Sequence, residues 1–213
     1  MKFGNFAVFG DSYSTFEGYV PEGYLFWYGP HKGVENGVLT VEQTWWHPIA
    51  TATGNHLLFN NSYSGSTICN TSYEKRYCPD SSLVGRMKIF DGHADDLDTL
   101  FVFAGTNDTW AGSPLGEPVE KPYDAYTDDE LRCVLPAVHC LLDYLRAKLP
   151  KTRIVLLIND YLSDPIKAAL HRGGEEYGCD VIDLPDVSRI DGHPTVDGMR
   201  EIREAIFAYY ENR

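Results

Sequence analysis

Four residues that could together perform acyl transfer occur in order along this chain. Ser12 lies near the start, in a Gly-Asp-Ser sequence that directly follows an apolar run. Gly65 and Asn107 come next, and His193 lies near the end. A serine hydroxyl becomes a strong nucleophile when a base removes its proton, and backbone or amide N–H groups stabilise the oxyanion that forms. The chain therefore holds a candidate nucleophile, candidate oxyanion donors and a candidate base.

Short apolar runs predict the strands that would position these residues. Continuous apolar runs of this length are typical of a parallel sheet that is covered on both faces. The runs span residues 6–9, 56–59, 100–104, 154–158 and 181–184. In open sheets of this kind, ligands bind at the carboxyl ends of the strands. Ser12, Gly65 and Asn107 each follow one of the runs, and His193 follows the fifth after a short loop, so we expect all four at one edge.

Helical patterns alternate with these runs. Apolar residues recur at three- and four-residue steps over 128–148, which predicts an amphipathic helix that Thr127 or Asp128 would cap. Further helices are predicted over 41–53, 82–90 and 165–177, and near the end, where an apolar stripe contains Met199, Ile202, Ile206 and Tyr209. This alternation predicts one α/β domain over residues 1–213: a three-layer α/β/α sandwich with a central, mostly parallel five-stranded sheet.

In two long segments the apolar residues show no clear periodicity. Both segments should overhang the expected site. Residues 16–41 are rich in glycine and aromatic side chains, and residues 111–126 are rich in proline and glycine. Irregular segments of this length commonly form lids or binding walls. The aromatic residues could stack on sugar rings, line an acyl pocket or simply pack within their loop. They are Tyr19, Tyr24, Phe26, Trp27 and Tyr28, with Trp110 beside Asn107.

Composition narrows the possible partners. The 213 residues carry a net charge of −13, which disfavours nucleic acid or an anionic membrane surface as a partner. No apolar run approaches the ~18 residues that a membrane span needs, and no signal-type leader precedes the first run, so we expect a cytoplasmic protein. The five cysteines form no metal-type pattern and should be reduced, although Cys69 and Cys78 could pair in an oxidising compartment. Cys133 and Cys140 should share one face of the helix over 128–148.

The chain resembles the SGNH, or GDSL, hydrolase superfamily. The resemblance rests on Gly-Asp-Ser at 10–12, Gly65, Gly-Thr-Asn-Asp at 105–108 and Asp-Gly-His-Pro at 191–194. It implies a flavodoxin-like sheet, with Ser12 as nucleophile and His193 as base. It also implies an oxyanion hole formed by the backbone N–H groups of Ser12 and Gly65 and by the side-chain amide of Asn107.

One position departs from the pattern of that superfamily. The carboxylate that orients the histidine normally lies three residues before it, whereas here Asp191 lies two residues before and Ile190 holds the usual position. Asp191 is the natural candidate, because a turn can absorb a one-residue change. Asp183, Asp186 or a main-chain carbonyl could orient His193 instead.

Three interpretations of function follow from the resemblance. The first is a serine esterase that works through an acyl-enzyme, without a metal or organic cofactor, on a small-molecule ester such as an acetylated carbohydrate. The second keeps the site but places longer acyl chains in it, as in a lysophospholipase or thioesterase. The third is a catalytically weak glycan-binding protein on the same scaffold. Polar, aromatic surroundings without a long apolar groove favour a small acyl group.

Overall fold

A central parallel sheet organises the computed structural model, which describes residues 1–31 and 35–211. Its strand order is β2-β1-β3-β4-β5, and every neighbouring pair is parallel. The strands are β1 Gly4–Gly10, β2 Asn55–Asn60, β3 Thr99–Phe103, β4 Arg153–Ile158 and β5 Asp180–Asp183. The structure confirms the five predicted strands, each displaced by two residues or fewer at either end.

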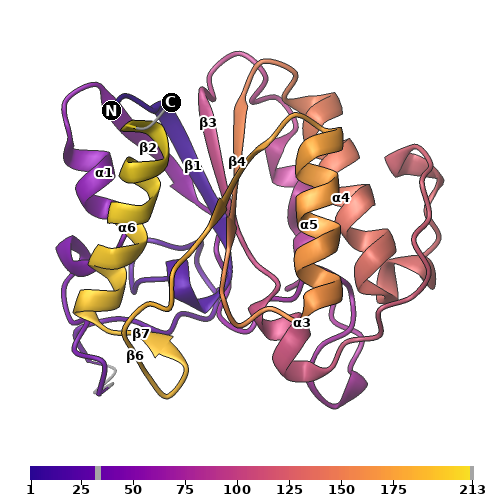
Figure 1. Ribbon diagram of the computed structural model, residues 1–213, viewed down its shortest axis with the longest axis horizontal. Helices are drawn as coiled ribbons and strands as arrows, with labels where there is room; N and C mark the ends of the chain where they lie inside the picture. The colour runs from indigo at the N-terminus through magenta and orange to yellow at the C-terminus, as the bar shows by residue number, and fades with distance from the viewer. Residues whose placement is uncertain (32–34, 212–213) are drawn as a thin grey trace.

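Helices cover both faces of the sheet, which confirms the three-layer α/β/α sandwich (Figure 1). On one side lie α1 His47–Thr51 and α6 Val196–Glu211, and on the other lie α2 Leu83–Arg86, α4 Val134–Lys148 and α5 Asp164–Glu176. Among the residues that the structure describes, no helix is both long enough and apolar enough to cross a membrane.

Alternating side chains of the strands divide the interior into two cores. Phe6 and Val8 of β1 point toward α1 and α6, whereas Ala7 and Phe9 point toward α2, α4 and α5. The same alternation runs through β3 and β4, because successive side chains of a strand face opposite sides of a sheet. Continuous apolar runs therefore suit this sheet, since both faces are buried.

Two helices begin later than the sequence predicts, and in each case a proline explains the later start. The helix expected over 128–148 begins at Val134, and the one expected over 41–53 is reduced to a short 3-10 turn followed by α1. A proline inside a helix removes a hydrogen bond and collides with the preceding turn, but it is tolerated in the first turn. The later starts place Pro136 and Pro48 in that first turn.

The cysteines also differ from expectation at one position. Cys133 precedes α4 as its N-cap residue, so it does not share a helix face with the buried Cys140. All five cysteines are free thiols, and Cys69 and Cys78 are therefore not joined.

The carboxyl edge of the sheet gathers the polar segments, at the lower end in Figure 1. A 3-10 turn, Ser12–Ser14, follows β1, and α3 Thr106–Ala111 follows β3. A small antiparallel hairpin of β6 Arg189–Ile190 and β7 His193–Pro194 precedes α6.

Candidate active site

The turn after β1 presents Ser12 to His193. The carboxylate of Asp11 accepts a hydrogen bond from the N–H of Tyr13 at 3.0 Å, which caps the turn in which Ser12 lies. Ser12 Oγ lies 3.0 Å from His193 Nε2, and both side chains are buried. This is hydrogen-bonding distance between a nucleophile and a base.

The second ring nitrogen of His193 defines the direction of that hydrogen bond. Nδ1 lies 3.1 Å from the main-chain carbonyl oxygen of Asp191. A carbonyl can only accept, so Nδ1 carries the proton and Nε2 is left to accept from the Ser12 hydroxyl. Burial lowers the pKa of His193, which favours the neutral imidazole that a general base needs.

No hydrogen bond joins the carboxylate of Asp191 to His193 among the described residues, so the geometry favours the carbonyl alternative over the carboxylate. Asp191 and Gly192 form the two-residue loop of the β6–β7 hairpin, and both have positive φ, 49° and 73°. Asp-Gly is a typical sequence for such a loop, because both residues tolerate this backbone conformation. The other candidates lie elsewhere: Asp183 pairs with His171, and Asp186 pairs with Arg189.

Asn107 lies in the first turn of α3, with its amide fixed by two hydrogen bonds. Its Nδ2 donates to the carbonyl of Ser66 at 3.0 Å, and its Oδ1 accepts from the Tyr73 hydroxyl at 2.8 Å. An amide nitrogen carries two N–H donors, so one remains for a ligand. Tyr73 thus defines which end of the amide is the donor.

Gly65 lies in the loop after β2 with φ of 86°. A Cβ at this position would meet no atom within 4 Å, so the left-handed backbone, rather than crowding, favours glycine here. Among the residues described, no hydrogen bond involves the backbone N–H of Gly65 or of Ser12. Both N–H groups are therefore available to an oxyanion.

Buried charges support the loops beneath the site. The Arg86 guanidinium donates to Ser66 Oγ at 2.9 Å and to the carbonyl of Gly10 at 3.3 Å, which joins the loop after β2 to the end of β1. Burial raises the pKa of Asp11 to about 7 and that of Asp108 to about 6. Asp108 accepts from two backbone N–H groups, those of Ile68 and Cys69.

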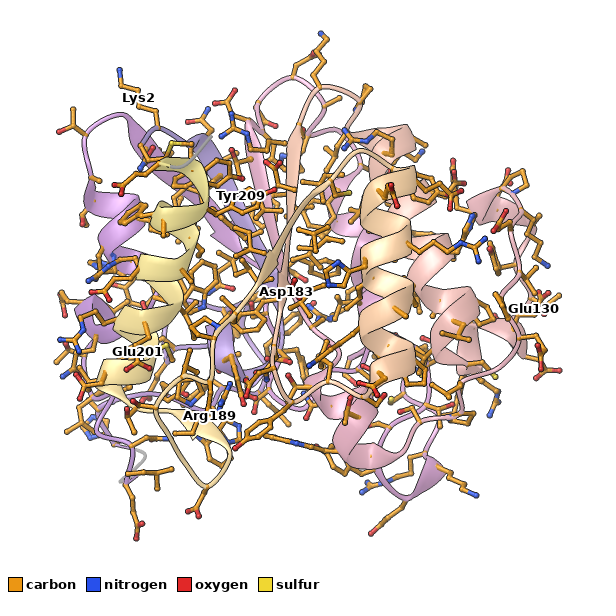
Figure 2. The ribbon with its side chains drawn as sticks, in the orientation of Figure 1. Lys2, Glu130, Asp183, Arg189, Glu201 and Tyr209 are labelled. Carbon is orange, nitrogen blue, oxygen red and sulfur yellow. The ribbon has the colours of Figure 1, made fainter. Side chains whose placement is uncertain are left out.

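The hairpin that carries His193 is held at two points. The Tyr13 hydroxyl donates to the carbonyl of Gly192, and Arg189 donates to the carboxylate of Asp160 and to Asn159 Oδ1. Only 4% of the Arg189 side chain is exposed, and Figure 2 shows this residue at the end of the molecule where β6 and β7 lie. These contacts fix the hairpin relative to the ends of β1 and β4.

The aromatic residues of segment 16–41 pack mainly against the protein. Trp27 stacks on the imidazole of His193, with ring centroids 3.7 Å apart and planes 7° apart. Tyr28 is fully buried, and Tyr24 and Tyr19 pack on neighbouring aromatic rings. Trp27 is thus part of the candidate site, with one face of its indole stacked on His193. Residues 32–34 of this segment lie outside the described residues.

An open hollow of about 430 Å³ adjoins the Asp191–Gly192 loop that precedes His193. Trp110 and Tyr161 line it together with Asp191 and Gly192. The two aromatic side chains are 39% and 47% exposed, so both present ring surface to the hollow. The hollow is a candidate place for part of a ligand.

Sequence reasoning missed several residues of this arrangement. Tyr73, Arg86 and Arg189 carry no motif and lie outside the strand ends that guided the search. Tyr161 and Asn159 follow β4, so the rule that ligands bind at carboxyl ends could have drawn attention to them.

Comparison with known proteins agrees with the fold and gives the family. The family model of GDSL-like lipases and acylhydrolases matches residues 4–210. A protein from Bacteroides ovatus described as a GDSL-like lipase is 34% identical, with a TM-score of 0.90 and full coverage of both chains. A second, from Bacteroides uniformis, is 37% identical, with a TM-score of 0.89 and coverage of 99% of this chain and 96% of its own.

A more distant structure shares the fold alone. An acetyl xylan esterase from Butyrivibrio proteoclasticus is 19% identical, with a TM-score of 0.58 over all of this chain and 64% of its own. A comparison with curated proteins finds no match.

This chain belongs to the GDSL-like lipase/acylhydrolase family. It is an ester hydrolase of that family.

Proposed function

We propose that the protein is a serine esterase that removes a small acyl group, such as acetyl, from a carbohydrate-like alcohol. The observation that carries the proposal is the 3.0 Å hydrogen bond between Ser12 Oγ and His193 Nε2, at a carboxyl edge that also holds Gly65 and Asn107.

The chemistry follows from that geometry in two steps. Ser12 Oγ forms a bond to the acyl carbon while its proton passes to His193 Nε2, and the carbonyl oxygen gains negative charge. The N–H groups of Ser12 and Gly65 and the free amide N–H of Asn107 stabilise that oxyanion. His193 then gives its proton to the leaving alcohol. In the second step, water gives a proton to His193 Nε2 while its oxygen forms a bond to the acyl carbon. The bond from that carbon to Ser12 Oγ then breaks, His193 returns the proton to Oγ, and the acid leaves.

The positions of two cavities support a small acyl group. The hollow beside the Asp191–Gly192 loop is open and aromatic, with Trp110 and Tyr161 at its wall. The apolar cavity of about 270 Å³ lies elsewhere, between α4, α5 and residues 118–120, and shares no lining residue with this hollow. Exposed aromatic faces suit the apolar faces of a sugar ring, so the alcohol part would lie over Trp110 and Tyr161. The distant acetyl xylan esterase, which shares the fold, acts on an ester of this kind.

The test compares Ser12→Ala with wild type on p-nitrophenyl esters from acetyl to octanoyl. We expect a maximum at acetyl, one fluorophosphonate label on the wild type, and neither turnover nor label in Ser12→Ala. The matched control is Ser62→Ala, since the Ser62 hydroxyl is buried without a hydrogen-bond partner among the described residues. That variant should label and turn over normally.

Two results would overturn parts of the proposal. A maximum at octanoyl would favour the lipid or thioester alternative. Micromolar binding of a glycan without hydrolysis or labelling would favour the glycan-binding alternative.

A further inference from the structure

The stack of Trp27 on His193 has a geometry that two neutral aromatic rings do not prefer. Neutral rings favour offset or edge-to-face contacts with centroids about 4.5–7 Å apart, because their quadrupoles repel in a face-to-face stack. Here the centroids are 3.7 Å apart and the planes are nearly parallel at 7°. A cation over the face of an indole is instead attracted by the same quadrupole. The geometry therefore suits an imidazolium better than an imidazole.

The backbone holds Trp27 relative to both members of the Ser12–His193 pair. The N–H of Trp27 donates to Thr15 Oγ1 at 2.9 Å, and the Thr15 hydroxyl donates to the carbonyl of Ser12 at 2.9 Å. The next residue, Tyr28, donates its hydroxyl to the carbonyl of Pro194 at 3.0 Å, directly after His193. The indole is thus tied to the nucleophile turn on one side and to the histidine hairpin on the other.

The indole itself has no polar anchor. Its N–H is buried and has no hydrogen-bond partner among the described residues. A buried N–H without a partner lowers stability. The position of the ring is therefore explained by its contact with His193 rather than by a hydrogen bond of its own.

His193 also lacks the partner that usually stabilises its charged form. In a catalytic triad, a carboxylate on Nδ1 orients the imidazole and stabilises the imidazolium. Here Nδ1 donates to a neutral carbonyl. The other rings near the imidazole are more distant and tilted: Tyr13 lies at 5.5 Å and 57°, and Trp110 at 5.7 Å and 63°.

We propose that Trp27 is a positioning residue that takes over, through its π face, the role of the missing carboxylate. It holds the plane of the imidazole and stabilises the imidazolium that forms when the Ser12 proton reaches Nε2. This inference rests on the proposed function for its effect on turnover. The stabilisation of the charged ring itself does not depend on any substrate.

Other charged or titratable groups lie near His193. A test must separate their influence on His193 from that of Trp27. Asp191 lies on the same hairpin and raises the pKa of His193, while burial lowers it more strongly. Asp11 and Tyr13 belong to the nucleophile turn, and Arg189 anchors the hairpin. A change at residue 27 must therefore leave the burial of His193 unaltered, because exposure alone would raise its pKa.

Fluorinated tryptophans meet that requirement, because each fluorine weakens the π face and barely changes the shape. Mono-, di- and trifluorotryptophan would be placed at position 27 alone. NMR of the histidine rings would give the pKa of His193 in the resting protein, and p-nitrophenyl acetate would give kcat and KM. The control places mono-, di- and trifluorophenylalanine at Phe3, which is buried in the same core just before β1, at the opposite edge of the sheet from His193.

We expect kcat and the pKa of His193 to fall together, step by step, along the series at position 27. Full loss of the interaction should lower kcat about 2- to 30-fold and the pKa by about 0.4–1.5, with KM nearly unchanged. The Phe3 series should change neither. Trp27→Leu, which keeps an apolar cover, should resemble the trifluoro variant, and Trp27→Phe should lie between it and wild type.

Three results would overturn the proposal: an unchanged pKa along the series, a pKa that rises, or equal effects at Phe3. An unchanged pKa would show that Trp27 only excludes water. If the wild type hydrolyses no ester, the proposed function fails, and the pKa series still decides whether Trp27 stabilises the imidazolium.

Discussion

The two cores of this protein differ in chemistry and in how they meet the candidate active site. The core beneath α4 and α5 is mainly aliphatic, whereas the core beneath α1 and α6 holds most of the large buried aromatic side chains. Members of the second core contact the nucleophile turn through their polar atoms. Trp45 Nε1 donates to Ser14 Oγ at 3.2 Å, and Trp46 Nε1 donates to the Ser14 carbonyl at 2.9 Å.

The difference shows how a buried polar site can be held rigid. Tyr and Trp combine a large apolar body with one hydrogen-bond donor, so they can pack in a core and still satisfy the backbone of a turn. Leucine and valine can only pack. We therefore expect damage to the aliphatic core to lower stability alone, and damage to the polar atoms of the aromatic core to lower turnover as well.

The largest effect on stability should come from Leu142→Ala in the aliphatic core. Leu142 is fully buried, and its Cδ1 lies against Gly173. The cavity should lower the free energy of unfolding by about 2–5 kcal/mol, measured by urea denaturation, with kcat/KM unchanged in the folded protein. The control, Leu142→Met, should cost less than about 1.5 kcal/mol. A large loss of kcat/KM in folded Leu142→Ala would contradict the division between the cores.

A smaller and more selective effect is expected from Tyr28→Phe in the aromatic core. The change removes the hydrogen bond to the carbonyl of Pro194 and leaves that carbonyl unpartnered, at about 1–3 kcal/mol of stability. Because Pro194 follows His193 and Tyr28 follows Trp27, kcat should fall by up to about tenfold, since 1.36 kcal/mol corresponds to a tenfold change in rate.

The matched control for Tyr28→Phe lies in the other core. The Tyr144 hydroxyl donates to Asp91 Oδ1 at 2.7 Å, away from the site. Tyr144→Phe should leave kcat unchanged. Equal losses of kcat in the two variants would argue against a special role for the aromatic core.

The pH dependence of kcat/KM tests how burial acts on His193. The base must be neutral, and burial lowers the pKa of His193 below its ordinary value of 6.5. Activity should therefore persist as the pH falls past 6.5 and decline only below it. Asp11, with a pKa of about 7, could add a second transition. The profile of Asp11→Asn separates the two, since only the His193 transition should remain.

The smallest effect is expected from Asp191→Asn. The main-chain carbonyl that orients His193 is unchanged, and asparagine tolerates the positive φ of 49° at this position. Turnover of p-nitrophenyl acetate should stay within about threefold of wild type, because only a nearby charge is lost. A loss of about 10⁴-fold, as expected for a triad aspartate, would show that the carboxylate orients His193 after all.

Much of the fold could be predicted because the pattern of apolar residues is local. The five strands, α5 and α6 follow from the spacing of apolar residues and from the turn-forming residues that end each run. The starts of α1 and α4 could have been predicted as well, since Pro48 and Pro136 fit only in a first turn. The Asp-Gly loop of the β6–β7 hairpin is also a local signal, and it explains why Asp191 presents its carbonyl to His193.

The sequence by itself determined which residues reach the carboxyl edge, because each of Ser12, Gly65 and Asn107 lies within a few residues of a strand end. Only the tertiary structure decided which atoms meet there. The stack of Trp27 on His193 and the hydrogen bond of Tyr73 to Asn107 join segments that are 166 and 34 residues apart. Contacts of this kind depend on how loops pack across the edge of the sheet. No local pattern of residues encodes that packing.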